Sequence, residues 1–271
     1  RQGQPVVRFP LPAEMSTLYA TGEKVIADQN EERWRPMCFN RAPLTEAQIR
    51  AIRAEHKAKF SNEPVIVVDS GNRGAGINIV FNLAGSVPSA AVTSFSIAEA
   101  YLESQFSDPI TVTVNVSFAN LGSGVIGATS SNFLTNRTYT AVRNGLVNGM
   151  DFNDTIQSLL PAGSTVPVRY VGTSATVTNE SNIDVTWANY KATIGSVGGS
   201  DGDMTYNSGF SFDYDPSDGV PGTRLSLVDT IVHEVGHALG FVSAADNSGG
   251  GQFETMDLFR FQRTDGTGDF N

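Results

Sequence analysis

Residues 225–242 constrain the fold and the chemistry of this 271-residue chain more than any other stretch. His233 and His237 lie four residues apart, so on a helix they lie one above the other on the same face. Apolar residues recur around them every three or four positions, which is typical of a helix with a buried face. These residues are Val228, Ile231, Val232, Val235, Leu239 and Val242. The stretch therefore predicts a buried helix that presents two histidines to one point.

Two histidines at this spacing on a rigid helix can bind a single metal ion, and zinc suits such ligands. Glu234 lies ~100° further round the helix, where it can hold a metal-bound water and act as general base. Gly240 suits the point where the helix ends and the chain turns toward a third ligand. The His-Glu-x-x-His-x-x-Gly spacing would arise by chance in roughly one in ten thousand chains of this composition. The alternative is an ordinary buried helix with a solvated Glu234.

The run His-Glu-Val-Gly-His-Ala-Leu-Gly-Phe, residues 233–241, resembles the active helix of zinc metallopeptidases of the metzincin kind. Its Gly-Phe ending is similar to the leishmanolysin branch. Together with residues 213–219 and 256–261, it resembles secreted bacterial metalloproteases. The resemblance implies an α+β fold, with a zincin-like twisted mixed sheet above an active-site helix. It also implies a secreted or cell-surface zinc endopeptidase that hydrolyses peptide bonds through a zinc-bound water activated by Glu234.

The third zinc ligand is open at this point. The common metzincin pattern has a third histidine three residues beyond the glycine, where this chain has Ser243, and no histidine follows the pair. One explanation is that the chain is a fragment and the ligand lies beyond it. Another is a carboxylate ligand, with Asp246 nearest and Glu254 or Asp257 further on. In the last, the site is degenerate and the protein is a non-catalytic extracellular structural or binding protein that keeps the fold.

Charge divides the chain near residue 62. Residues 1–62 carry ten Lys or Arg against seven Asp or Glu, whereas residues 63–271 carry eight against twenty-one. We expect a basic N-terminal segment that docks on an acidic catalytic domain as a pro-segment would, with a basic arm of no regulatory role as the alternative. Cys38, the only cysteine, could bind zinc as a thiolate and keep a zymogen latent, or be a small buried apolar side chain. His56 is interpreted as a surface residue.

Carboxylates also gather in the Gly-rich connection before the active helix, at Asp201, Asp203, Asp213, Asp215 and Asp218, and the last three are the candidate calcium ligands. Oxygen ligands on such a loop suit Ca²⁺, and a solvated acidic turn is the alternative. The net charge of −10 argues against nucleic acid or an anionic membrane as the main partner. No apolar run reaches the ~20 residues of a membrane span. The expected substrate is protein or peptide, and the oligomeric state is open.

The remaining patterns predict alternating helices and strands. Apolar residues alternate strictly from Ile110 to Phe118, which predicts a half-buried strand. Further strands are expected at 65–68, 77–83 and 166–171, and helices at 45–60, 92–106, 139–147, 153–160 and 187–194. Residues 196–224 are interpreted as a Gly/Asp/Ser-rich connection that is interrupted at 210–214. This order favours an α/β or α+β class.

Overall fold

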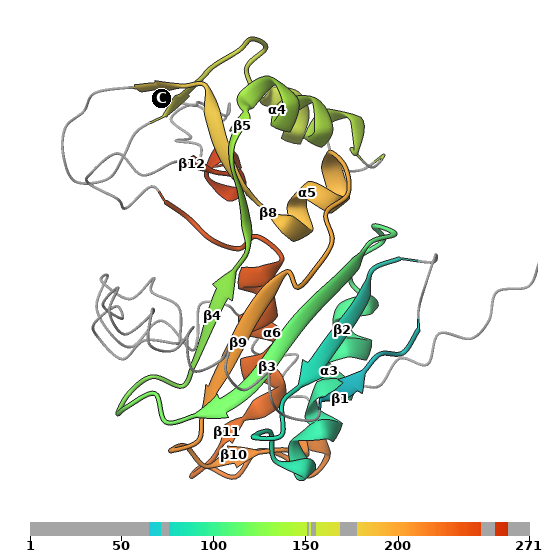
Figure 1. Cartoon of the computed structure of the whole chain (residues 1–271), viewed down its shortest axis with the longest axis vertical. Helices are drawn as coiled ribbons and strands as arrows, with labels where there is room; N and C mark the ends of the chain where they lie inside the picture. The colour runs from blue at the N-terminus through green and yellow to red at the C-terminus, as the bar shows by residue number, and fades with distance from the viewer. Residues whose placement is uncertain are drawn as a thin grey trace, which may run out of the picture.

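The computed structural model describes residues 65–71, 76–150, 152, 156–168, 178–244 and 253–259. The basic N-terminal segment with Cys38 and His56, its expected helix, and Asp246 lie outside the described residues. Within them the chain forms four α-helices and two main sheets, which occupy opposite ends of the molecule (Figure 1). This confirms the α+β class. None of the described helices is long and apolar enough to cross a membrane.

The larger sheet has five strands in the order β1-β2-β3-β9-β4. Its three middle strands are parallel: β2 (Asn78–Leu83), β3 (Thr111–Ala119) and β9 (Gly202–Asn207). The two outer strands, β1 (Ile66–Val68) and β4 (Gly127–Ser131), run antiparallel to their neighbours. The apolar residues that alternate along β3 (Val112, Val114 and Val116) are fully buried, as the sequence predicts.

Two helices pack together on one face of this sheet, α3 (Val92–Glu103) and α6 (Leu227–Ala238) (Figure 1). The rings of Phe81, Phe95 and Tyr206 lie between sheet and helices, with centroids 5.2 and 5.8 Å apart in edge-on contacts. The apolar stripe of α6 is buried at Val228, Ile231 and Val235, which confirms the expected helix and its core face. The stretch that carries His233 and His237 is thus held by the main core.

The start of α6 is fixed by a short pair of parallel strands, β10 (Phe212–Asp213) and β11 (Leu225–Ser226). Ser226 is the N-cap, because its hydroxyl oxygen accepts a hydrogen bond of 3.2 Å from the backbone N–H of Asp229. Figure 1 shows α6 running from this end of the larger sheet toward the smaller sheet.

The smaller sheet has the order β12-β8-β5, formed by β5 (Phe133–Thr138), β8 (Asn182–Thr186) and β12 (Phe253–Glu254). Asn132 links β4 directly to β5, so one length of chain passes from one sheet to the other. The remaining elements of this end are α4 (Tyr139–Asn148), α5 (Trp187–Thr193), η2 (Ile156–Leu159), the hairpin β6 (Val166–Val168) with β7 (Thr178–Glu180), and η4 (Thr255–Phe259). They surround a second core that includes Tyr139, Ile183 and Leu258.

Three sequence-based expectations need correction. The helix expected at 92–106 ends at Glu103, and the described part of the one expected at 153–160, residues 156–160, contains the 3₁₀ turn η2. The supposed connection 196–224 contains β9, a middle strand of the larger sheet, and β4 and β5 were not expected at all. These strands contain many polar residues, so the apolar alternation that identifies β3 is missing from them.

Candidate metal centre

His233 and His237 stand on consecutive turns of α6 and direct their rings to one point. Their Nε2 atoms are 3.2 Å apart, and the two rings are almost perpendicular, with centroids 4.9 Å apart. Two nitrogens bound at 2.0–2.1 Å to one tetrahedral zinc ion would lie about 3.3 Å apart. The pair is therefore spaced to share a single ion, as the sequence predicts.

The surroundings of the two rings suit metal binding. Nδ1 of His237 lies 2.8 Å from the carbonyl oxygen of Phe241. Since a carbonyl can only accept a hydrogen bond, Nδ1 of His237 carries a proton, which leaves Nε2 as the nitrogen that would bind a metal ion. Burial, together with the neighbouring His237, lowers the pKa of His233 to about 4, so that ring is neutral at neutral pH. Metal binding needs neutral imidazoles.

A sharp turn after α6 brings the Phe241 carbonyl back to His237. Gly240 makes this turn with φ of 102°, a conformation that favours glycine. A Cβ at Gly240 would also collide with the side-chain amide of Asn189, which donates a 2.7 Å hydrogen bond to the carbonyl of Leu239. The predicted end of the helix at Gly240 is confirmed, and α5 supplies the group that caps it.

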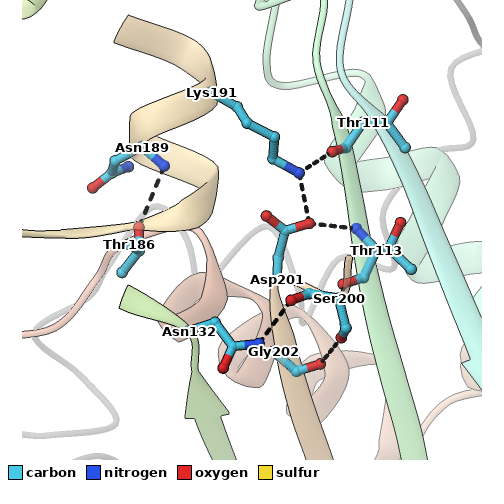
Figure 2. A network of polar contacts seen from close by, with 9 residues as sticks. All are labelled: Thr111, Thr113, Asn132, Thr186, Asn189, Lys191, Ser200, Asp201 and Gly202. Atoms are coloured by element: carbon cyan, nitrogen blue, oxygen red, sulfur yellow. Dashed lines mark hydrogen bonds and ion pairs between the residues drawn. The ribbon is translucent and has the colours of Figure 1, made fainter. Parts of the chain in front are cut away.

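α5 is fixed to the larger sheet by a buried ion pair (Figure 2). Nζ of Lys191 lies 2.7 Å from Oδ2 of Asp201, which also accepts a 2.7 Å hydrogen bond from the backbone N–H of Thr113. Lys191 donates further to the carbonyl of Thr111. Because the Asp201 side chain is fully buried, loss of Lys191 would leave an uncompensated charge. The network therefore fixes α5, and with it Asn189, against the end of α6.

Glu234 follows the first histidine but is turned toward β4. It is only 1% exposed, and its Oε2 accepts a hydrogen bond from the hydroxyl of Thr129. The same hydroxyl lies 3.2 Å from the backbone carbonyl oxygen of Glu234. A Cβ built on Gly127 would be 2.8 Å from Oε1. The carboxylate thus lies between α6 and the edge strand β4.

The described residues do not complete a coordination shell. They contain no group of three or more His, Cys, Asp or Glu side chains that could hold a metal ion. The carboxylate of Asp257 instead binds backbone, accepting from the N–H groups of Ala244 at 3.0 Å and Glu254 at 3.1 Å and from the Ser243 hydroxyl. Asp257 therefore fastens the chain after α6 to η4, and a third ligand such as Asp246 stays a prediction.

Glu254 is a half-buried acid beside two others. Burial, and then the charges of Asp257 and Asp184, raise the pKa of Glu254 to about 7. Asp184 is its direct partner across the parallel pair β12–β8. Within the described residues, Oε2 of Glu254 is buried without a hydrogen-bond partner. A bound cation would itself lower this pKa, so Glu254 as the third ligand stays a prediction.

The three acids proposed for calcium take different places. Asp213 is buried in β10, while Asp215 and Asp218 are exposed. Asp215 caps the turn η3 (Pro216–Asp218) by accepting a 3.1 Å hydrogen bond from the N–H of Ser217. They belong to no group able to hold a metal among the residues that the structure describes. The Asp215 cap agrees with the acidic-turn alternative, and calcium binding stays a prediction.

Compared with family models, with curated proteins and with solved structures, the chain gives no match. The interpretation of the site therefore depends on its own residues. Sequence reasoning identified His233, His237 and Glu234 but missed the residues that hold them, which are Gly127, Thr129 and Asn189. No local pattern could have found these three, because each is separated from its partner on α6 or in the turn after it by at least 50 positions.

Proposed function

We propose that this chain is a zinc-dependent endopeptidase with a zincin-like, metzincin-related catalytic domain, acting outside the cell that makes it. The observation that carries the proposal is the spacing of 3.2 Å between the Nε2 atoms of two histidines on a buried helix. Glu234 lies next to this pair in sequence and reaches β4. A single cation at the point that the two Nε2 atoms share would be bound by both rings at once.

The residues take distinct roles in this proposal. His233 and His237 hold the ion, and the carbonyl of Phe241 keeps the second ring in the required tautomer. A bound zinc ion supplies Lewis-acid polarisation of the scissile carbonyl and of the attacking water. Glu234 takes a proton from that water as it attacks the carbonyl carbon, and then delivers the proton to the leaving amine nitrogen.

The edge strand β4 supports a peptide as the substrate. β4 ends the larger sheet, and within the described residues no strand pairs with its outer edge. An extended peptide can add to such an edge through backbone hydrogen bonds, whatever its side chains. Since the Glu234 carboxylate lies against β4, a peptide bound along this strand would pass close to the base.

The test measures metal and activity in the full chain. We expect about one zinc per chain by elemental analysis after dialysis, and chelator-sensitive hydrolysis of casein. The assay includes Cys38→Ser, because a Cys38 thiolate bound to the zinc would keep the protein latent. Glu234→Gln should retain zinc and lose at least about 100-fold in activity. Zinc binding without cleavage in the wild type and in Cys38→Ser would favour the non-catalytic binding protein. Zinc with hydrolysis of non-peptide substrates alone would favour a different hydrolase.

A further inference from the structure

We infer that Thr129 is a positioning residue for Glu234, with Gly127 leaving the space that the carboxylate occupies. The inference rests on the proposed function, since it concerns the orientation of the proposed base. Both residues belong to β4, whereas the histidines belong to α6. The inference therefore makes β4 a second wall of the site, opposite the wall formed by α6.

Alternate residues of β4 face α6. Thr129 donates to Oε2 of Glu234, and the hydroxyl of Ser131 donates a 2.9 Å hydrogen bond to the backbone carbonyl of His237. Gly127, two positions before Thr129, lies against Oε1 of Glu234. Side chains two apart share one face of a strand. This face of β4 therefore supplies the hydroxyls of Thr129 and Ser131 and, at Gly127, a space without a side chain. All three positions lie against the turn of α6 that carries Glu234 and His237.

The position of β4 is fixed from its other side by β9. Gly127 is paired with Tyr206 and Thr129 with Met204, in an antiparallel register without a bulge. Tyr206 and Met204 are fully buried in the main core. Because a slip of one residue would reverse every side chain of β4, the core sets the place of the Thr129 hydroxyl. Thr129 thus offers Glu234 a donor at a fixed point.

The donor on Thr129 restricts the orientation of the Glu234 carboxylate. The terminal torsion of a glutamate side chain is broad, so burial alone does not set the plane of the carboxylate. A hydrogen bond is directional, and the one from the Thr129 hydroxyl engages Oε2. With Oε2 held, Oε1 is directed over Gly127. The hydroxyl therefore selects one orientation of Glu234 before substrate or metal arrives.

Gly127 is explained by space and not by backbone conformation. It lies within β4 and has no positive φ, so any residue could adopt its backbone conformation. A glycine inside a strand usually weakens the strand. A Cβ at this position would be 2.8 Å from Oε1 of Glu234, closer than real Cβ atoms approach, and 3.3 Å from Cδ, which is also a tight contact. The absence of a side chain at Gly127 is thus what allows Glu234 to lie against β4.

The test compares variants of the full chain that differ at one hydroxyl. Thr129→Val keeps the shape of the side chain and removes the donor, and Thr129→Ser keeps the donor. Ser130→Ala is the matched control, because Ser130 is adjacent in β4 but on the alternate face. We expect Thr129→Val to lower kcat by about tenfold or more, with KM within about twofold and with unchanged zinc content and melting temperature. Thr129→Ser should restore kcat, and Ser130→Ala should match the wild type.

A second measurement does not need activity. The visible absorption of the Co²⁺-substituted chain reports the surroundings of the ion. We expect the spectrum of Thr129→Val to depart from the wild type in the direction of Glu234→Gln, and those of Thr129→Ser and Ser130→Ala to coincide with the wild type. If the wild type cleaves no peptide but the spectra behave in this way, the proposed function fails and the positioning role stands.

Three results would overturn the positioning role. The first is a Thr129→Val enzyme with wild-type kcat and spectrum, which would leave the proposed function intact. The second is a Thr129→Ser variant as impaired as Thr129→Val, because the hydroxyl would then not be the cause. The third is a wild-type chain that binds no Co²⁺, which would overturn both the positioning role and the proposed function.

Discussion

The two walls of the candidate centre, α6 and β4, are specified by the sequence in different ways. α6 begins at a Ser226 cap, repeats its apolar residues at helical spacing, and places His233 and His237 one turn apart. β4 has the sequence Gly-Ala-Thr-Ser-Ser and contains neither a cap nor an apolar alternation. Its contacts with α6 join residues 105 positions apart, between Thr129 and Glu234. The helix is specified by its own residues, and the strand by what surrounds it.

The largest effect should follow from a change on the helix wall. His237→Ala removes one of the two proposed ligands, and we expect zinc affinity to fall by about a thousandfold, or about 4 kcal/mol. Competition with a fluorescent chelator measures this fall. His56→Ala is the control, because His56 is interpreted as a surface residue. Equal zinc affinity in the two variants would mean that the pair on α6 does not hold the ion.

A change at the end of the helix wall should have the next largest effect, and this effect should be on the stability of the fold. Gly240→Ala places a Cβ where φ is 102° and where the side chain of Asn189 already lies. We expect the free energy of unfolding of the metal-free chain to fall by about 3 kcal/mol. Urea denaturation measures it. Gly222→Ala is the control, since Gly222 has no positive φ and a Cβ there meets no atom within 4 Å. Similar losses in both variants would show that the turn carries no special strain.

The strand wall should respond in catalysis and not in stability. Gly127→Ala pushes the carboxylate of Glu234 away from β4, because its Cβ would lie 2.8 Å from Oε1. We expect kcat to fall by about 30-fold while zinc content stays the same. A steady-state assay with a quenched peptide gives kcat and KM separately. If KM rises and kcat does not change, Gly127 serves substrate binding along the edge and not the base.

The difference between elements specified by their own residues and elements specified by their surroundings also explains how much of the fold could be predicted. β3 and α6 were predicted because their buried faces are apolar and periodic. β9 is just as buried, yet it includes Thr205 and Asn207. Thr205 is 3.1 Å from the hydroxyl of Ser117, and the Asn207 amide donates to the carbonyls of Gly122 and Val125 at 2.7 and 2.6 Å. Polar residues satisfied by distant partners hide a core strand from any local apolar pattern.

The residues of the candidate site also fall into those that the sequence could predict and those that it could not. The histidine pair and Glu234 could be predicted, because helix geometry alone places residues four apart on one face. Thr129, Gly127 and Asn189 could not, since their roles exist only after sheet and helices have packed. The polar groups that hold a reacting side chain often come from remote parts of the chain, and one sequence does not reveal such pairs.

The smallest expected effect is a change of stability with pH that depends on Glu254. This residue belongs to the segment after α6 in the chain that Asp257 holds by hydrogen bonds. The pKa of Glu254 is about 7 in the folded chain, above its ordinary value of 4.5. The unfolded chain therefore loses this proton first, and stability falls as pH rises from 4.5 to 7. We expect a loss of about 2 kcal/mol across this window, after allowing for the remaining solvent contact of the side chain.

His233 titrates in the opposite sense, because its pKa is lowered from 6.5 to about 4, so that stability rises with pH between these values. Urea denaturation of the metal-free chain gives the free energy of unfolding at each pH. The difference in this free energy between the wild type and Glu254→Gln isolates the contribution of Glu254. Hydrogen exchange over the same pH range should show loss of protection at 253–259 and not in β4, since β4 is fixed by β9. Equal loss in both regions would mean that the two walls are one cooperative unit, and the distinction between them would fail.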